Sequence, residues 1–160
     1  MEHFAALDAQ QLRQAYSRLA AGTSVVTMIA PEGTKIGLTV SAVTSVSVEP
    51  PLMLVCINSK SRAIGALESG VPFVINLLSR SQEAVGMQFA SREADKFAGV
   101  AHDMTDSGAL YLSNTLANIE CVPHEIVPTG DHYVVIGAVT DVRLGDDAPP
   151  LVFFRSRFMA

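Results

Sequence analysis

Small hydroxyl residues gather beside a glycine in residues 37–47, which read GLTVSAVTSVS. Side chains of this size let a planar ligand approach the backbone, and their O–H groups and the nearby N–H groups can donate hydrogen bonds. The isoalloxazine ring of a flavin needs such donors, because negative charge develops on it during reduction. A strand rich in Thr and Ser whose polar face meets water would have the same composition, so both interpretations stay open.

A second candidate is the segment of residues 58–61, NSKS, which separates an apolar run from a short helical pattern. Ser61 is predicted to be the N-cap of that helix. Free N–H groups at a helix N-terminus and the ammonium of Lys60 would together suit a phosphate. A phosphate ligand requires such a local site, because the net charge of −5 gives no general attraction to anions. An ordinary helix cap beside a solvated lysine is the alternative.

Two further segments could meet a nicotinamide dinucleotide. His132 follows Gly130 and Asp131 at a predicted hairpin, where it could hydrogen-bond a carboxamide or neutralise a reduced flavin, with Asp131 orienting it. A turn histidine that only caps the hairpin is the alternative. Residues 150–158, PLVFFRSRF, combine aromatic rings with arginines that could stack on and pair with a dinucleotide, or form a last strand in the core or an interface.

The remaining histidines and cysteines indicate no metal site. His3, His102 and His124 are expected at the surface. Cys56 and Cys121 lie in apolar runs and are expected to be buried free thiols. The sequence contains no nucleophile elbow, Walker loop or G-x-G-x-x-G motif. Hydride transfer between two cofactors needs none of these, because the cofactors supply the chemistry and the protein aligns them.

The elements that must position these residues are mostly strands. The 160 residues fit one domain, residues 1–160, and the acidic balance argues against nucleic acid or an anionic membrane as a partner. With neither a basic leader nor a long apolar run, the cytoplasm is the expected location.

Helices are predicted over residues 62–69 and 82–90, the latter with a capping box of Ser79 and Gln82, and a first helix from Asp8 to a closing Gly22. Residues 91–107 are expected to be irregular. Strands are expected over residues 23–30, 35–41, 44–48, 52–57, 72–78, 116–127, 132–144 and 151–154. This order predicts a mainly β, antiparallel barrel with a few peripheral helices.

Taken together, the segments resemble the short-chain flavin reductase family, whose fold is the flavin reductase-like, FMN-binding split β-barrel of Greek-key type. The resemblance covers nearly the whole chain and rests on the order and spacing of several blocks. These blocks are residues 21–27 (AGTSVVT), 37–42 (GLTVSA), 45–52 (SVSVEPPL), 73–79 (FVINLLS), 89–90 (FA), 95–97 (DKF), 120–121 (EC), 130–132 (GDH) and 150–153 (PLVF). The resemblance implies an NAD(P)H:flavin oxidoreductase that reduces FMN or FAD with NADH or NADPH. It also implies a homodimer that supplies reduced flavin to a partner monooxygenase acting on aromatic compounds.

The resemblance also implies roles for individual residues. Those beside the isoalloxazine and ribityl chain are Thr39, Val40, Ser41, Ala42, Ser45, Val46 and Ser47. Those around the ribityl phosphate are Cys56, Ile57, Asn58, Ser59, Lys60 and Ser61. The far wall of the site comprises Phe89, Ser91 and Lys96, and His132 lies near the nicotinamide. The tail that helps to hold the dinucleotide contains Phe154, Arg155 and Phe158.

Two positions depart from the family pattern. Ala42 stands where a serine is frequent, which removes one hydroxyl contact. Arg62 stands where smaller or polar residues are common, and it would either strengthen a phosphate contact or block an adenylate. The choice between FMN and FAD therefore stays open. Other functions also stay open: a flavoprotein that keeps FMN and reduces a quinone or metal chelate, a flavin-binding module without catalysis, or a plain structural barrel.

Overall fold

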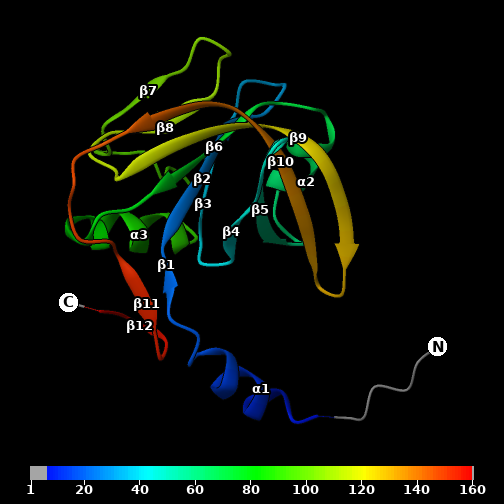
Figure 1. Cartoon of the computed structure of the whole chain (residues 1–160), viewed down its shortest axis with the longest axis vertical. Coiled ribbons are helices and arrows are strands. Elements are labelled where there is room, and N and C mark those ends of the chain that lie inside the picture. Colours follow the sequence, from blue (N-terminus) through cyan, green and yellow to red (C-terminus); the bar gives the residue numbers. More distant parts are fainter. Residues whose placement is uncertain (1–6, 160) are drawn as a thin grey trace.

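The computed structural model describes residues 7–159 and consists mainly of antiparallel strands, as predicted (Figure 1). The main sheet has the strand order β3-β2-β6-β9-β10-β5-β4. Its strands are β2 (Ser24–Ile29), β3 (Lys35–Val40), β4 (Val43–Val48), β5 (Pro51–Asn58), β6 (Phe73–Leu77), β9 (Ala117–Thr129) and β10 (His132–Leu144).

The sheet curls because its two outer strands, β3 and β4, are consecutive in the sequence. Only Ser41 and Ala42 join them. The backbone N–H of Cys56 in β5 donates to the carbonyl of Ala42 at 3.0 Å, so the two outer parts of the sheet meet at this turn. β3 pairs with β2 on one side only, so its other edge has no strand partner among residues 7–159, which is consistent with a split barrel.

β2 lies between two hydrophobic cores, which explains its continuous burial. Val26 and Met28 face the interior of the barrel with residues of β5, β6 and the helix α2 (Ala63–Glu68). Val25 faces the opposite side and packs with Phe89 and Leu151 in a second core. β-branched residues suit a strand that is covered on both faces.

The helices agree only partly with the sequence pattern. The predicted capping box of Ser79 and Gln82 is present at the 3-10 turn η1 (Arg80–Gln82), which leads into α3 (Glu83–Ala90). Asp8 caps α1 (Ala9–Tyr16) by accepting a hydrogen bond from the N–H of Gln10 at 2.9 Å. The prediction that this helix closes at Gly22 is wrong: Ser17 is its C-cap, because Gly22 belongs to β1 (Ala21–Gly22) and pairs there with Val152.

Short strands complete the fold. β1 pairs with β11 (Val152–Phe154), which pairs with β12 (Arg157–Met159), and β7 (His102–Met104) pairs with β8 (Leu110–Leu112). The expectation that residues 91–107 are irregular is therefore wrong where β7 lies. None of the helices in residues 7–159 has the length and apolar character needed to cross a membrane.

Candidate functional site

Three hollows border strand β3. The central cavity, about 420 Å³, is lined by Leu38, Thr39, Val40, Ser41, Ala42, Cys56, Ile57, Asn58, Thr129, His132 and Val134. The cationic cavity, about 220 Å³, is lined by Lys35, Ile36, Gly37, Leu38, Lys60, Ser61, Arg62, Glu93, Ala94 and Lys96. The apolar cavity, about 240 Å³, is lined by Thr23, Thr39, Val40, Ser41, Met87, Ala90, Phe153 and Phe158. Because neighbouring cavities share residues of β3, a long ligand can follow this strand.

Gly37 lets the second core approach β3 from behind the cavities. A Cβ atom there would lie only 2.5 Å from Cδ1 of Phe89 and 3.2 Å from Cζ of Phe97. Thr39 ties the strand to α3, because its hydroxyl donates to the carbonyl of Gly86 at 2.7 Å. The predicted O–H donor of Thr39 is therefore already used within the protein.

Three backbone N–H groups in the turn of residues 58–61 are used within the protein. The N–H of Ser59 donates to the carbonyl of Asp131 at 3.0 Å, and that of Lys60 donates to Oδ1 of Asn58 at 3.0 Å. The N–H of Ser61 donates to the carbonyl of Asn58 at 2.9 Å. The N-cap of α2 is Arg62 rather than Ser61, although the Ser61 hydroxyl accepts a hydrogen bond from the N–H of Ala63 at 3.3 Å. Ser59, Lys60 and Ser61 could therefore bind an anion only through their side chains.

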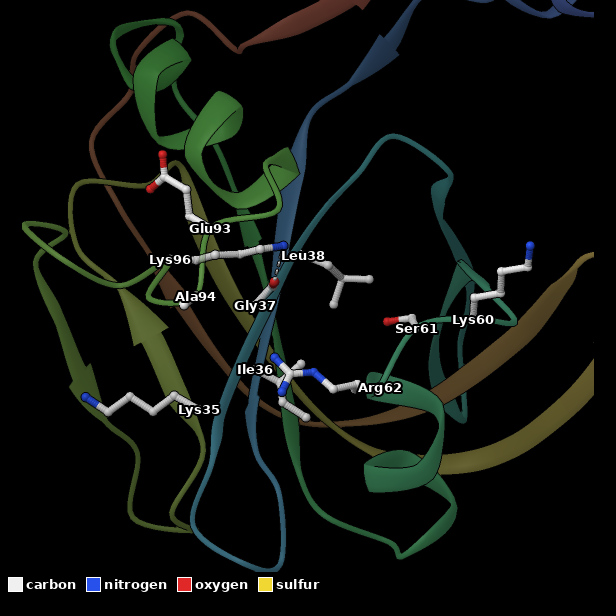
Figure 2. Close-up of a pocket in the computed structure, with 10 residues that line it drawn as sticks. All are labelled: Lys35, Ile36, Gly37, Leu38, Lys60, Ser61, Arg62, Glu93, Ala94 and Lys96. Carbon is white, nitrogen blue, oxygen red and sulfur yellow. Dashed lines mark hydrogen bonds between the residues drawn. The ribbon is translucent and has the colours of Figure 1, made fainter.

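Two cationic side chains point into the cationic cavity from opposite sides. Figure 2 shows the guanidinium of Arg62 and the ammonium of Lys96 directed toward the backbone of β3, whereas the charged ends of Lys35, Lys60 and Glu93 point away. The ammonium of Lys96 donates to the carbonyl of Phe89 at 2.9 Å and of Gly37 at 3.4 Å. Burial lowers the pKa of Lys96 from its ordinary value of 10.5, and the positive charge of Arg62 lowers it further. Like charges held together in a cavity favour an anion between them.

Lys35 is held away from this cavity by a histidine. Nζ of Lys35 lies 2.9 Å from Nε2 of His102, whose Nδ1 lies 2.7 Å from the carbonyl of Val100. His102 is half-buried against Phe97, with ring centroids 5.2 Å apart, so the expectation of a plain surface histidine is wrong. His124 is exposed as expected, and His3 lies outside the described residues.

His132 lines the central cavity and is paired with its neighbour. Its Nδ1 lies 2.7 Å from Oδ1 of Asp131, and this hydrogen bond and the charge of His132 lower the pKa of Asp131. In the neutral imidazole the pair places the proton on Nδ1, which makes Nε2 the acceptor. This geometry agrees with the role predicted for Asp131, which is to orient His132.

The two cysteines differ, although both were expected to be buried. Cys121 is buried, and burial together with the charge of Glu120 raises the pKa of its thiol to about 12. Cys56 is only half-buried and lines the central cavity, so the expectation is wrong for this residue.

The structure brings together many of the predicted site residues. Those that line at least one of the three cavities are Thr39, Val40, Ser41, Ala42, Cys56, Ile57, Asn58, Lys60, Ser61, Lys96, His132 and Phe158. Those that line none of the three are Ser45, Val46, Ser47, Ser59, Phe89, Ser91, Phe154 and Arg155. Phe89 lies behind β3 in the second core, and the hydroxyl of Ser91 donates to the carbonyl of Gln88 at 2.8 Å.

Some lining residues were not predicted. Arg62 had been noticed only as a departure from the family pattern. Thr23 and Met87 were not singled out as site residues, and Phe153 was noted only as part of the candidate segment of residues 150–158; segments distant in the sequence bring the three together.

Comparison with known proteins identifies the family. Residues 16–160 match the family described as "Flavin reductase like domain". The chain belongs to this family. It is 37% identical over 155 residues to "Actinorhodin polyketide dimerase" of Streptomyces coelicolor, covering 97% of the chain and 88% of that relative. It is 35% identical over 155 residues to "NADH:riboflavin 5'-phosphate oxidoreductase" of Streptomyces pristinaespiralis, covering 96% and 88%.

A solved structure agrees with the fold. The crystal structure of nitrilotriacetate monooxygenase component B from Mycobacterium thermoresistibile has a TM-score of 0.88 and 33% identity, and the match covers 94% of the chain and 84% of that structure. The comparisons confirm the predicted family, the mainly β fold and the enzyme class, an NAD(P)H-dependent flavin reductase with a flavin and a nicotinamide as cofactors.

Proposed function

We propose that this flavin reductase binds FMN or FAD along β3, with a flavin phosphate in the cationic cavity and the isoalloxazine ring in the central cavity. The observation that carries the proposal is that Arg62 and Lys96 enter the cationic cavity from opposite sides and that the charge of Arg62 is felt at Lys96. A phosphate neutralises two such charges, and an arginine can hold it with two hydrogen bonds. The residues present therefore fit a flavin phosphate.

Residues of the central cavity would hold and orient the ring. The central cavity shares the lining residue Leu38 with the cationic cavity, so one flavin could extend from the first into the second. Backbone groups of residues 39–42 border it, and the small side chains of Ser41 and Ala42 allow close approach. When bound, the flavin accepts a hydride from the nicotinamide of NADH or NADPH. Asp131 holds His132 in place, and Nε2 of His132 would accept a hydrogen bond from a bound cofactor at the open side of this cavity.

The proposal includes a homodimer. α1 contains no buried residue, and Figure 1 shows it extending away from the body of the protein. Leu7, Tyr16 and Leu19 are 67%, 64% and 70% exposed, and Val48 on the outer strand β4 is 92% exposed. Apolar side chains displayed in this way are typical of an interface, and a second copy of the chain would cover them. Sedimentation equilibrium tests this: the mass of a single chain at micromolar concentration would contradict it.

We also propose that the reduced flavin leaves for a partner monooxygenase. The name of the similar solved structure, a monooxygenase component, supports this role. All three cavities are open to solvent in part, which suits a flavin that binds and is released.

The function is tested by the loss of NADH or NADPH absorbance with purified protein, with and without added FMN, FAD or riboflavin. Oxidation that increases with the added flavin would support a reductase that uses flavin as a substrate. Oxidation that needs a quinone or metal chelate instead would favour the flavoprotein with retained FMN. Bound flavin without any oxidation would leave only a binding module.

A further inference from the structure

Lys35 belongs to the cationic cavity but keeps its charge outside it. The residue lines the cavity beside Gly37, whereas Figure 2 shows its ammonium pointing away. Nζ of Lys35 lies 2.9 Å from Nε2 of His102 on β7 and 5.8 Å from the centre of the Phe97 ring. Among residues 7–159, neither Lys35 nor His102 forms an ion pair with a carboxylate. The hydrogen bond to the histidine is therefore the main contact that holds this ammonium.

The contacts of His102 define where the neutral ring carries its proton. Nδ1 lies 2.7 Å from the carbonyl of Val100, which can only accept, so the proton is on Nδ1. Nε2 is then an acceptor and takes a hydrogen bond from the Lys35 ammonium. The ring packs edge to face on Phe97, with 5.2 Å between the ring centroids. A neutral His102 thus holds the Lys35 ammonium outside the cationic cavity.

A second proton on His102 would break this contact. An imidazolium and an ammonium can only donate hydrogen bonds, and they carry like charges. The ammonium of Lys35 would then have to leave Nε2 of His102. Histidine is the side chain whose charge normally changes between about pH 5 and 8. Mild acid is therefore the condition that would free Lys35.

The other charged side chains on the elements around His102 are engaged elsewhere. Asp103, the next residue of β7, and Asp95, in the loop after α3, each accept a hydrogen bond from a nearby backbone N–H, at 2.8 Å and 3.0 Å. The ammonium of Lys96 donates to two backbone carbonyls. On β8, the residue opposite His102 is the uncharged Leu112. Lys35 is thus the charged group that meets this ring directly.

We propose that Lys35 is a third phosphate-binding residue of the cationic cavity and that His102 controls it. Neutral His102 holds the Lys35 ammonium outside, and protonated His102 releases it toward the phosphate bound by Arg62 and Lys96. Glu93 is the one carboxylate that lines the cavity, and its charged end points away. A flavin phosphate should therefore bind more tightly in mild acid. This inference rests on the proposed function, because it presumes a flavin phosphate in this cavity.

The test compares Lys35→Gln, which removes the charge, with His102→Gln, whose amide can accept from Lys35 but does not titrate. FMN affinity is measured by flavin fluorescence between about pH 5.5 and 8. The phosphate of FMN itself titrates near about pH 6, so each variant is compared with the natural protein at the same pH. At about pH 8 the three proteins should bind FMN nearly alike. At about pH 5.5 both variants should bind roughly three- to tenfold more weakly than the natural protein, because one charge-assisted contact is missing. Riboflavin, which has no phosphate, should show no such difference.

Nuclear magnetic resonance of the natural protein provides a second readout, which a purely structural role of His102 would not produce. At about pH 8 the long-range proton–nitrogen spectrum should show the His102 proton on Nδ1. FMN should raise the pH at which His102 gains its second proton by roughly half to one pH unit, because binding and protonation are linked. Lys35→Gln should remove most of this shift.

Three results would overturn the inference. They are the same change of FMN affinity with pH in the natural protein and in Lys35→Gln, a proton on Nε2 of neutral His102, and unchanged protonation of His102 when FMN binds. Failure of the proposed function looks different. If Arg62→Gln binds FMN like the natural protein, the phosphate lies elsewhere and the proposed site is refuted. If Arg62→Gln binds FMN more weakly and the pH effect is absent, only the role of Lys35 and His102 is refuted.

Discussion

The cationic and the apolar cavity lie along the same strand and have opposite chemistry. The cationic cavity borders the first half of β3 and owes its character to Arg62 and Lys96, long side chains that come from a turn and a loop. The apolar cavity borders the end of β3 and is formed by α3 and the hairpin of β11 and β12. One strand can therefore offer a phosphate and an uncharged ring separate places.

The substitution with the largest expected effect is Gly37→Ala, because it would disturb the packing of β3, the strand that both cavities border. The new Cβ would meet the Phe89 ring, which is buried and cannot move aside. We expect a loss of about 1–3 kcal/mol in the free energy of unfolding, together with weaker binding of flavin and dinucleotide. Denaturant unfolding measures the loss.

Gly65→Ala is the matched control for Gly37→Ala. Gly65 lies within α2, and a Cβ there would meet no atom within 4 Å. This variant should gain up to about 1 kcal/mol from helix propensity. Equal stability of the two variants would contradict the packing described around β3.

Arg62→Gln should weaken phosphate binding in the cationic cavity and leave the other two cavities unchanged. We expect FMN to bind about tenfold more weakly, because a charge-assisted contact to phosphate is lost, while riboflavin binding stays the same. Lys60→Gln is the control, because the Lys60 ammonium points away from the cavity and its loss should matter less. Titration followed by flavin fluorescence measures both. A larger effect for Lys60 than for Arg62 would place the phosphate elsewhere.

Alkaline pH should weaken FMN binding in the cationic cavity, because Lys96 loses its charge. Burial and the charge of Arg62 lower the pKa of Lys96, so its ammonium loses a proton below the ordinary 10.5. FMN affinity should therefore fall, by a few-fold, as the pH rises through this lowered pKa. In Arg62→Gln the like charge is absent, so the fall should move to higher pH although binding is weaker throughout. A fall that persists unchanged in Lys96→Gln would assign it to another group.

The smallest expected effect is on the rate of thiol labelling, which compares Cys56 in the central cavity with Cys121 in the core. Only a thiolate reacts readily. Cys121 is buried, and its pKa of about 12 keeps its thiol protonated. One thiol per folded chain should react with a disulfide reagent at pH 8, and Cys56→Ser should abolish the reaction. Bound FMN should slow the labelling of Cys56, because this residue lines the cavity proposed for the ring. Rapid labelling of Cys121 would contradict the buried position.

The sequence predicted the parts of the molecule whose signals are local. The strands around β2 and β3 have β-branched runs that end at turn residues, and the capping box of Ser79 lies within four residues. β7, β8 and β12 have three residues each, too few to show an alternating pattern. The sequence could not show that the N–H of Ser59 donates to the carbonyl of Asp131, because that residue lies far along the chain. The apolar cavity could not be predicted, because Thr23, Met87 and Phe158 meet only after folding.

The most direct test of the account is a crystal structure of the protein with FMN bound. The account predicts the phosphate within hydrogen-bond distance of the Arg62 guanidinium and the Lys96 ammonium, and the isoalloxazine ring in the central cavity beside residues 39–42. An isoalloxazine ring seated in the apolar cavity, or a phosphate that contacts neither Arg62 nor Lys96, would contradict it.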